Sequence, residues 1–305
     1  METIVCGDAL EYLKRMEPES VNTCVTSPPY YNLRDYGTSG QIGTENTPEE
    51  YIDKLAAVFQ EVRRVLRPDG TLWVNIGDSY AAKSGPQPSG YKGKDLIGVP
   101  WMLAFALRRD GWYLRQDIVW QKPNAMPESV KDRCTKSHEY VFLLSKSARY
   151  YFDAAAIREK AAESSVARYK CAFYSGKKDL AGFGRKSSVH PNTPGMRVFT
   201  GYRNKRSVWS ISTAGFRGAH FAVFPEKLVE PCVLAGCPEG GTVLDPFAGS
   251  GTTGVVAKRL HRNFLGIEIN AEYVSMAADR IAATVVECPQ EQLTIEAALS
   301  ADIIK

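Results

Sequence analysis

The chain has 305 residues, a formal net charge of +4, 44% hydrophobic and 24% charged residues, which is the balance of a globular protein with one large core. No apolar run approaches the roughly 18–20 residues of a membrane span, and the first residues lack the basic and apolar segments of a signal peptide, so we expect a cytoplasmic protein with no membrane partner. The seven cysteines form no CxxC pair, which favours free thiols in a reducing compartment.

The first 110 residues alternate short apolar runs with helical patterns, which is typical of an α/β sheet. Asp8 follows the first apolar run and suits the N-cap of the first helix. Thr47 suits a second N-cap, with Pro48 at the first helical position and Glu50 at the third. The expected elements are strand 3–7, helix 9–16, strand 21–25, helix 48–66, strand 71–76 and helix 99–109.

Ser27-Pro28-Pro29-Tyr30 directly follows strand 21–25. Two consecutive prolines fix φ and remove two backbone donors, so the chain is stiff there and cannot continue a ladder. The Ser27 hydroxyl and the Pro28 carbonyl can accept the hydrogens of an exocyclic amino group, and the Tyr30 ring can stack on its base. A rigid surface turn is the alternative for a lone motif of this kind, and a second motif favours the functional interpretation.

The middle of the chain predicts a hairpin. Residues 113–121 and 138–145 have the alternating or apolar pattern of strands, and a loop with Lys122, Pro123 and Asn124 joins them. The later expected elements are a helix from about 225, a strand at 242–245, a strand at 264–268 and a helix at 271–283.

Residues 158–206 differ in charge from the rest of the chain. They hold twelve Lys or Arg and three acidic residues, a net charge of +9 that leaves −5 on the remainder. Aromatic side chains and glycines interleave the basic ones. A charge-rich stretch is most often a solvated face, but one this lopsided on an otherwise acidic protein predicts a phosphate-binding surface.

The second motif runs from Asp245 to Gly254 and reads DPFAGSGTTG. An apolar strand ends in an acid, turns through glycines and enters a helix, whose first N–H groups can receive an anionic group such as a carboxylate. The next strand ends at Glu268, where a carboxylate can accept both hydroxyls of a ribose.

An NAD-dependent oxidoreductase is an alternative, because Gly249, Gly251 and Gly254 also spell GxGxxG. Alone, that pattern is weak. Too few residues follow Asp245 for the rest of a dinucleotide-binding domain, and the proline-rich motif has no evident use in hydride transfer. We therefore rank the oxidoreductase behind an interpretation that uses both motifs.

With both motifs, the chain resembles the β class of amino-methylating DNA methyltransferases, which use S-adenosylmethionine. The resemblance covers roughly residues 3–283 and rests on Ser-Pro-Pro-Tyr coming first and Asp-Pro-Phe-x-Gly-x-Gly-Thr last. It implies an α/β fold, a circularly permuted class I methyltransferase (Rossmann-like) sheet of seven strands with an inserted basic target-recognition region. The implied domains are a catalytic half at 1–150, the target-recognition region at 151–219, a cofactor-binding half at 220–285 and a C-terminal tail at 286–305.

The resemblance also assigns candidate site residues. Ser27, Pro28, Pro29 and Tyr30 match the catalytic motif, which holds a flipped base while its amino nitrogen attacks the methyl group. The residues that match the cofactor contacts are Asp8, Asp245, Phe247, Gly249, Gly251, Thr252 and Glu268. We expect S-adenosylmethionine as the cofactor and no metal, because Cys134 and His138, the closest mixed pair of metal-ligating side chains, gather no further ligands.

The target base stays open between two amino groups. In the resembling class, Ser before Pro-Pro favours N4 of cytosine and Asp favours N6 of adenine, so cytosine is the first choice and adenine the alternative. Methylation at carbon 5 of cytosine needs a thiolate in a Pro-Cys-Gln setting, which neither Pro231-Cys232-Val233 nor Cys288-Pro289-Gln290 supplies, so we exclude that class. An RNA methyltransferase and a non-catalytic DNA-binding protein remain as further alternatives.

The resemblance implies double-stranded DNA as the partner and a bacterial or phage origin. It leaves open a homodimer and a cognate restriction endonuclease, which this chain does not encode.

Overall fold

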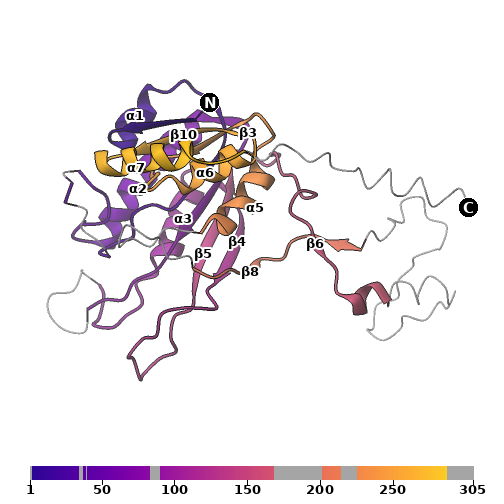
Figure 1. Cartoon of the computed structure of the whole chain (residues 1–305). Helices are drawn as coiled ribbons and strands as arrows, with labels where there is room; N and C mark the ends of the chain where they lie inside the picture. The colour runs from indigo at the N-terminus through magenta and orange to yellow at the C-terminus, as the bar shows by residue number, and fades with distance from the viewer. Residues whose placement is uncertain are drawn as a thin grey trace, which may run out of the picture. The chain divides into compact units, whose positions relative to one another are not determined.

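The structure is a computed structural model that describes residues 2–33, 37–38, 40–82, 90–167, 201–213 and 225–286. Two compact units make up the chain, one formed by Met1–Asp153 with Ser207–Lys305 and the other by Ala154–Arg206. The first unit holds the main sheet and its helices (Figure 1). The described residues leave out much of the expected target-recognition region at 151–219. They also leave out all but the first residue of the expected tail at 286–305, so the domain boundaries stay predictions.

The main sheet has the strand order β1-β10-β9-β2-β3-β5-β4-β8. The five strands from β1 to β3 in that order run parallel, β5 is antiparallel to both of its neighbours, and β8 is parallel to β4. The predicted α/β sheet and the hairpin are therefore confirmed. The bounds are β1 Glu2–Cys6, β2 Val21–Thr26, β3 Leu66–Ile76, β4 Tyr113–Gln121, β5 His138–Ser145, β8 Val208–Ser210, β9 Thr242–Asp245 and β10 Asn263–Glu268.

Eight strands form this sheet, so the expectation of seven was wrong by one. The additional strand, β8, has three residues and pairs with the outer side of β4. A run this short, in which only Trp209 is buried, has no periodicity that a sequence pattern reveals. β3 also begins earlier than residue 71, because the chain leaves the preceding helix directly into the sheet and Leu66 already pairs with Val21.

The helices form two groups. α1 (Ala9–Arg15), α2 (Pro48–Val65) and α3 (Val99–Arg109) pack in sequence order, α1 on α2 and α2 on α3. α5 (Glu226–Gly236), α6 (Thr252–Arg259) and α7 (Ala271–Ala282) pack in the same way and lie together in Figure 1. No helix among the described residues is both long and apolar enough to cross a membrane.

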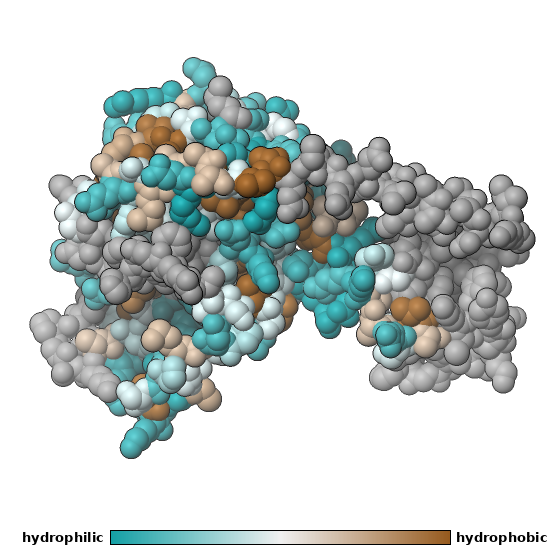
Figure 2. Space-filling view, viewed as in Figure 1, coloured by the Kyte–Doolittle hydropathy of each residue, from teal (hydrophilic) through white to brown (hydrophobic). Residues whose placement is uncertain are grey.

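Helix α2 shows how the sequence sets one of these elements. Thr47 accepts a 3.2 Å hydrogen bond from the Glu50 amide, and Pro48 occupies the first turn, as predicted. The helix then buries a stripe of apolar side chains in the core, and full burial of one such side chain stabilises the fold by about 1.5–3 kcal/mol. The face of the molecule in Figure 2 correspondingly shows apolar side chains only in small groups among hydrophilic ones. The stripe consists of Tyr51, Ile52, Leu55, Val58, Phe59, Val62 and Val65.

The smaller unit contains a two-stranded antiparallel sheet of β6 (Glu159–Lys160) and β7 (Tyr202–Arg203). Glu159 lies 3.3 Å from Arg203, 3.6 Å from Lys205 and 3.9 Å from Arg206. One carboxylate therefore lies within ion-pair distance of three cationic side chains.

Candidate active site

Strands β9 and β2 are neighbours in the sheet, and the chain proceeds from them in opposite directions, from β9 to β10 and from β2 to β3. Such a divergence leaves a crevice at the carboxyl ends of the two strands, where ligands of open α/β sheets bind. β9 ends at Asp245 and β2 ends at Thr26, directly before Ser27. Two motifs about 220 residues apart in the sequence therefore meet at one sheet edge, as expected.

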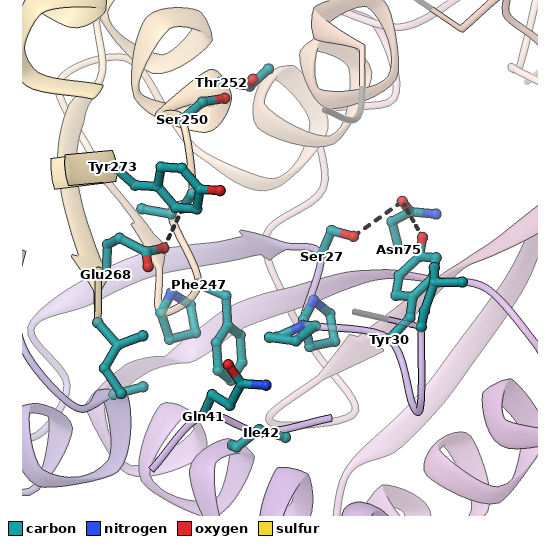
Figure 3. A pocket seen from close by; sticks show the side chains of 18 of the residues that line it. Ser27, Tyr30, Gln41, Ile42, Asn75, Phe247, Ser250, Thr252, Glu268 and Tyr273 are labelled. Carbon is teal, nitrogen blue, oxygen red and sulfur yellow. Dashed lines mark hydrogen bonds between the residues drawn. The ribbon is translucent and has the colours of Figure 1, made fainter. Parts of the chain in front are cut away.

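One pocket, with a cavity of about 260 Å³, spans this edge (Figure 3). Nine of the eleven predicted site residues line it, and Asp245 and Gly251 do not. The nine are Asp8, Ser27, Pro28, Pro29, Tyr30, Phe247, Gly249, Thr252 and Glu268. The pocket thus brings the proline-rich motif and the glycine turn into a single site.

Glu268 holds the glycine turn in place. One carboxylate oxygen accepts a 2.8 Å hydrogen bond from the Gly249 amide, and the other accepts a 2.9 Å bond from the Asn270 amide. Burial raises the pKa of Glu268, although these backbone hydrogen bonds oppose the shift. Gly249 itself has φ of +50°, a conformation that suits glycine.

Asp245 is fully buried and acts behind the pocket wall. Its carboxylate accepts hydrogen bonds from the Thr26 hydroxyl at 2.6 Å, the Thr253 hydroxyl at 2.7 Å and the Phe247 amide at 3.1 Å. Burial raises the pKa of Asp245 to about 6 against the opposing effect of these three donors. The structure therefore places this predicted cofactor residue where it shapes the turn that contains Phe247.

Local geometry explains why a glycine stands at position 251 and an aspartate at position 8. Gly251 has φ of +80°, and a Cβ there would come 2.8 Å from Cβ of Ala277 in α7. Asp8 accepts a 2.9 Å hydrogen bond from the Glu11 amide and caps α1, while it also lines the pocket. The capping and ligand-binding interpretations of Asp8 are thus compatible.

The Ser-Pro-Pro-Tyr segment is fixed by its neighbours. Tyr51 donates a 2.7 Å hydrogen bond to the Pro29 carbonyl. The Tyr30 ring rests against Gly77, where an added Cβ would come 2.6 Å from Cε2 of the ring. The Tyr30 hydroxyl donates a 2.7 Å hydrogen bond to Glu139, and burial, followed by the charge of Glu139, raises the pKa of Tyr30 well above its ordinary value.

Asn75 connects Ser27 to this network. Its amide nitrogen lies 3.2 Å from Glu139 Oε2 and 3.1 Å from the Tyr140 carbonyl, two groups that only accept hydrogen bonds when the carboxylate is ionised. The amide oxygen of Asn75 must therefore face the hydroxyls of Ser27, at 3.4 Å, and Tyr30, at 3.2 Å.

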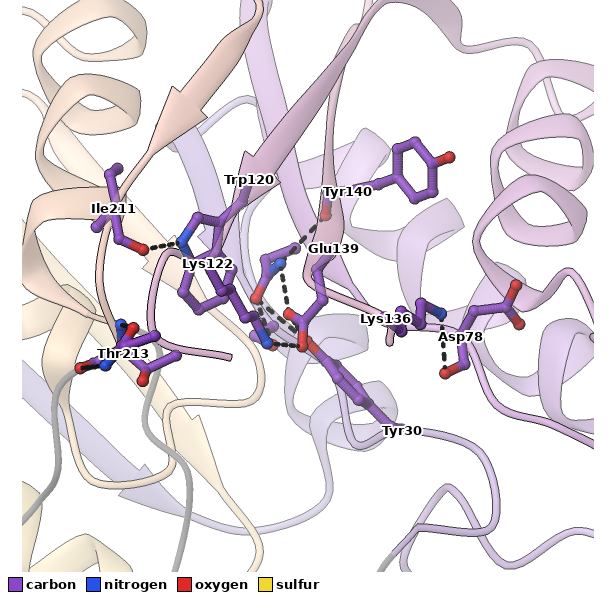
Figure 4. A network of polar contacts seen from close by, with 12 residues as sticks. Tyr30, Asp78, Trp120, Lys122, Lys136, Glu139, Tyr140, Ile211 and Thr213 are labelled. Carbon is purple, nitrogen blue, oxygen red and sulfur yellow. Dashed lines mark hydrogen bonds and ion pairs between the residues drawn. The ribbon is translucent and has the colours of Figure 1, made fainter. Parts of the chain in front are cut away.

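Lys122 and Trp120 complete the polar side of the pocket (Figure 4). Lys122 forms an ion pair with Oε1 of Glu139, and its ammonium group lies 4.4 Å from the centre of the Trp120 ring. The Trp120 indole donates a 2.8 Å hydrogen bond to the Ile211 carbonyl, just after β8. The late strand β8 thereby helps to orient a pocket-lining aromatic side chain.

Comparison with known proteins shows the family of the chain. Residues 21–279 match a family model described as DNA methylase. The chain belongs to the DNA methylase family. Its relatives include the Type II methyltransferase M.Cfr9I of Citrobacter freundii, 47% identical over 297 residues that cover 92% of this chain and 87% of the relative. The Type II methyltransferase M.SmaI of Serratia marcescens is 46% identical over 296 residues, 91% of this chain and 90% of the relative.

Solved structures agree with this membership. A protein of Thermus thermophilus described as a candidate DNA modification methylase, complexed with S-adenosyl-L-methionine, is 26% identical with a TM-score of 0.61 and covers 94% of this chain and 98% of its own. PvuII DNA methyltransferase (cytosine-N4-specific) shares the fold, with a TM-score of 0.64, 23% identity and coverage of 92% and 86%. The predicted family and fold class are confirmed, as is the enzyme class, an S-adenosylmethionine-dependent DNA methyltransferase.

The residues of this methylase fit the cofactor. The ribose hydroxyls of S-adenosylmethionine need hydrogen-bond acceptors, its flat adenine needs apolar walls, and its carboxylate needs hydrogen-bond donors. The pocket offers the carboxylates of Glu268 and Asp8, the apolar side chains of Phe247 and Ile269, and the glycine turn that leads to the start of α6.

Sequence reasoning missed the polar wall of the pocket, which consists of Asn75, Trp120, Lys122, Glu139 and Thr213. A usable signal was present. Asn75 is a polar residue directly after the apolar run 72–74 of β3. Trp120 pairs with Glu139 across the predicted hairpin, so residues at the open ends of its two strands lie opposite each other.

Proposed function

We propose that this methylase transfers a methyl group from S-adenosylmethionine to N4 of a cytosine that is flipped out of duplex DNA. The shared pocket carries the proposal, because Ser27 and Pro28 line the same cavity as Gly249 and Glu268. An amino group held at the first pair and a methyl donor held at the second are oriented for an in-line transfer, and orientation of this kind supplies a large part of enzymatic rate enhancement.

Glu268 and the glycine turn form the cofactor half of the proposal. The Glu268 carboxylate accepts hydrogen bonds from the backbone of Gly249, Asn270 and Ile269. A carboxylate has about four lone-pair sites, so one remains for a ribose hydroxyl. The start of α6 receives the carboxylate of the cofactor, and Asp8 accepts from its adenine end. When bound, S-adenosylmethionine supplies the electrophilic methyl group.

The Ser-Pro-Pro-Tyr segment forms the base half. The Ser27 oxygen and the Pro28 carbonyl accept the amino hydrogens, so the nitrogen lone pair is directed at the methyl group. Tyr30 stacks on the base, and its hydroxyl contact with Glu139 fixes the plane of the ring. As positive charge builds on the amino nitrogen, the two oxygens that face it stabilise the transition state.

Asn75 is a positioning residue in this mechanism. Its amide oxygen accepts the Ser27 hydroxyl hydrogen, which leaves the lone pairs of Ser27 available to the amino group of the base. Glu139 and the Tyr140 carbonyl hold the amide in that orientation.

The site supports amino methylation over carbon methylation. None of the described residues that line the pocket is a cysteine, so no thiolate is in place to form a covalent adduct with a pyrimidine ring. Cys288, the other cysteine considered for that role, lies outside the described residues.

Cytosine is favoured over adenine because Ser27 stands before Pro-Pro in a chain that resembles the β class. N6 of adenine is the second candidate, since its amino group asks for the same two acceptors. We further propose duplex DNA as the substrate, because the basic segment 158–206 suits phosphates. The cytoplasmic location, the homodimer and the companion endonuclease expected from the resemblance stay predictions.

The test is transfer of labelled methyl from S-adenosylmethionine to unmethylated duplex DNA, followed by digestion to nucleosides and mass detection. We expect N4-methylcytosine. Detection of N6-methyladenine instead would identify adenine, the second candidate, as the target base. Ser27→Ala should lower transfer about 100-fold or more while cofactor affinity stays within a few-fold. Ser20→Ala is the matched control, because the Ser20 hydroxyl bonds the Glu17 carbonyl at the surface, away from the pocket. Label in RNA alone would contradict the proposed substrate.

A further inference from the structure

We propose that Lys122 reads the 2-oxo group of the target cytosine and is thereby a residue that determines base specificity. This inference rests on the proposed function, because it adds a contact to the 2-oxo group of the base whose amino group Ser27 and Pro28 hold. The loop that begins at Lys122 joins the two strands of the hairpin β4–β5, and no role in methyl transfer has so far required it.

Charge singles out Lys122. Among the described residues that line the pocket, it is the one Lys or Arg. Its side chain is 19% exposed and that of its partner Glu139 is 14% exposed, so the pair is largely withdrawn from water. A buried ion pair is weak evidence for stability, because the cost of desolvating both charges rivals their attraction. Stability therefore does not explain why the pair lies at the pocket wall, whereas contact with a ligand would explain it.

Hydrogen-bonding capacity makes Lys122 available to a ligand. An ammonium group has three donors, and the contacts of Lys122 within the described structure are one carboxylate oxygen of Glu139 and the face of the Trp120 ring. Glu139 Oε1 takes one donor, which leaves donors that can turn toward the cavity.

The polarity of the wall matches the edge of cytosine. Ser27 connects to Asn75, Asn75 to Glu139 and Glu139 to Lys122, so the wall has acceptors at one end and a cation at the other (Figure 4). Cytosine presents an amino donor, then a ring nitrogen acceptor, then a 2-oxo acceptor. Adenine presents an amino donor and a ring nitrogen acceptor, but a C–H group follows. With the amino group at Ser27, only cytosine places an acceptor at the cationic end.

The experiment compares two substrates with the full-length protein and saturating S-adenosylmethionine. One duplex contains the target cytosine, and the other contains at that position a 2-aminopyridine C-nucleoside, which keeps the amino group and the ring nitrogen but lacks the 2-oxo group. The variants are Lys122→Met, which keeps the aliphatic stem against Trp120, and Lys122→Gln, which keeps a donor without the charge. The matched control is Lys136→Met, because Lys136 lies on the same connection, contacts the Asp78 carbonyl and does not line the pocket.

We expect Lys122→Met to lower kcat/KM on cytosine about 10- to 100-fold, the range for a hydrogen bond to a charged group, and to change it less than about 3-fold on the analogue. The wild type should lose a similar factor when it is given the analogue. Lys122→Gln should lie between wild type and Lys122→Met, and Lys136→Met should resemble the wild type on both substrates.

Three outcomes would overturn the inference. An equal loss on both substrates would make the ion pair a structural support of the hairpin, and a wild type that methylates the analogue as fast as cytosine would remove the 2-oxo contact outright, whatever the variants do. A wild type that methylates adenine and not cytosine would overturn the proposed function as well, and that result is visible in the wild type alone.

Discussion

Thr26 donates a 2.6 Å hydrogen bond to Asp245, and this contact joins the end of β2 to the end of β9. Both residues are fully buried. Thr26 directly precedes the Ser-Pro-Pro-Tyr segment, and Asp245 directly precedes the glycine turn, so this contact fixes the position of one half of the pocket relative to the other. A methyl transfer that depends on the alignment of donor and acceptor depends on this joint.

Asp245 should make the stability of the fold depend on pH. Burial raises its pKa from 3.8 to about 6, so the folded protein holds this proton more tightly than the unfolded chain. Its contribution to the free energy of unfolding is full below about pH 4 and is lost as the pH rises through about 6. Asp245→Asn cannot ionise, and we expect its stability relative to wild type to increase by about 3 kcal/mol between about pH 4 and pH 7.

Urea unfolding of both proteins across that pH range measures the difference. The amide that Asp245→Asn introduces is tolerated in principle because Thr253 also lies 3.4 Å from the Val25 carbonyl, a second acceptor for its hydroxyl. The control is Asp279→Asn, an exposed position on α7. A stability difference that stays constant with pH would contradict the assignment.

Glu268→Gln should weaken the binding of S-adenosylmethionine about 10- to 100-fold, because the proposed ribose contact loses its charged acceptor. The variant should approach the wild-type kcat at saturating cofactor, since Glu268 lies away from the base half of the pocket. Isothermal titration calorimetry measures the affinity, and Glu272→Gln, exposed in the first turn of α7, is the control. Unchanged affinity in Glu268→Gln would remove the carboxylate from the cofactor site.

Gly77→Ala should displace Tyr30, because the added Cβ would come 2.6 Å from the ring. Overpacking of this kind costs about 1–3 kcal/mol of stability. The shifted ring should also raise KM for DNA, while cofactor affinity stays unchanged. Thermal unfolding and steady-state kinetics test both effects, with Gly7→Ala as a stability control, since nothing lies within 4 Å of a Cβ there. A variant with wild-type KM would show that Tyr30 does not stack on the base.

Asn75→Ala should lower kcat about 10- to 100-fold and leave the affinity for S-adenosylmethionine within a few-fold, because the Ser27 hydroxyl loses its acceptor. Asn75→Asp restores an acceptor but places a second carboxylate beside Glu139. Its activity should therefore recover as the pH falls and the new carboxyl group is protonated, whereas wild type should not show this rise. If Asn75 has a purely structural role, the activity of wild type and of Asn75→Asp will show the same dependence on pH.

Much of the fold could be predicted because its signals are local. The cap at Thr47, the apolar period of α2 and the strand ends at Thr26 and Asp245 all depend on neighbours within a few residues. The two motifs were also enough to expect one shared sheet edge, since each marks a strand end.

The polar wall depended on contacts that are distant in sequence. Asn75, Glu139 and Lys122 come from three strand ends, and their meeting point follows from the antiparallel pairing of β5 with both β3 and β4. The role of Asp245 was equally hidden, because an acid at a strand end suggests a ligand contact until its burial and its three hydrogen-bond donors are known. Strand β8 had too few residues to show a period.

The ends of the segment Ala154–Arg206 are anchored on both sides. Asp153 directly precedes the segment, and its amide donates a 2.9 Å hydrogen bond to the Ala235 carbonyl. Ser207 directly follows the segment, and its carbonyl accepts a 2.8 Å bond from the Val119 amide. One flanking residue is thus bonded to α5 and the other to β4, so we expect changes in the length or sequence of the intervening segment to leave the strand registers that position the pocket unaltered.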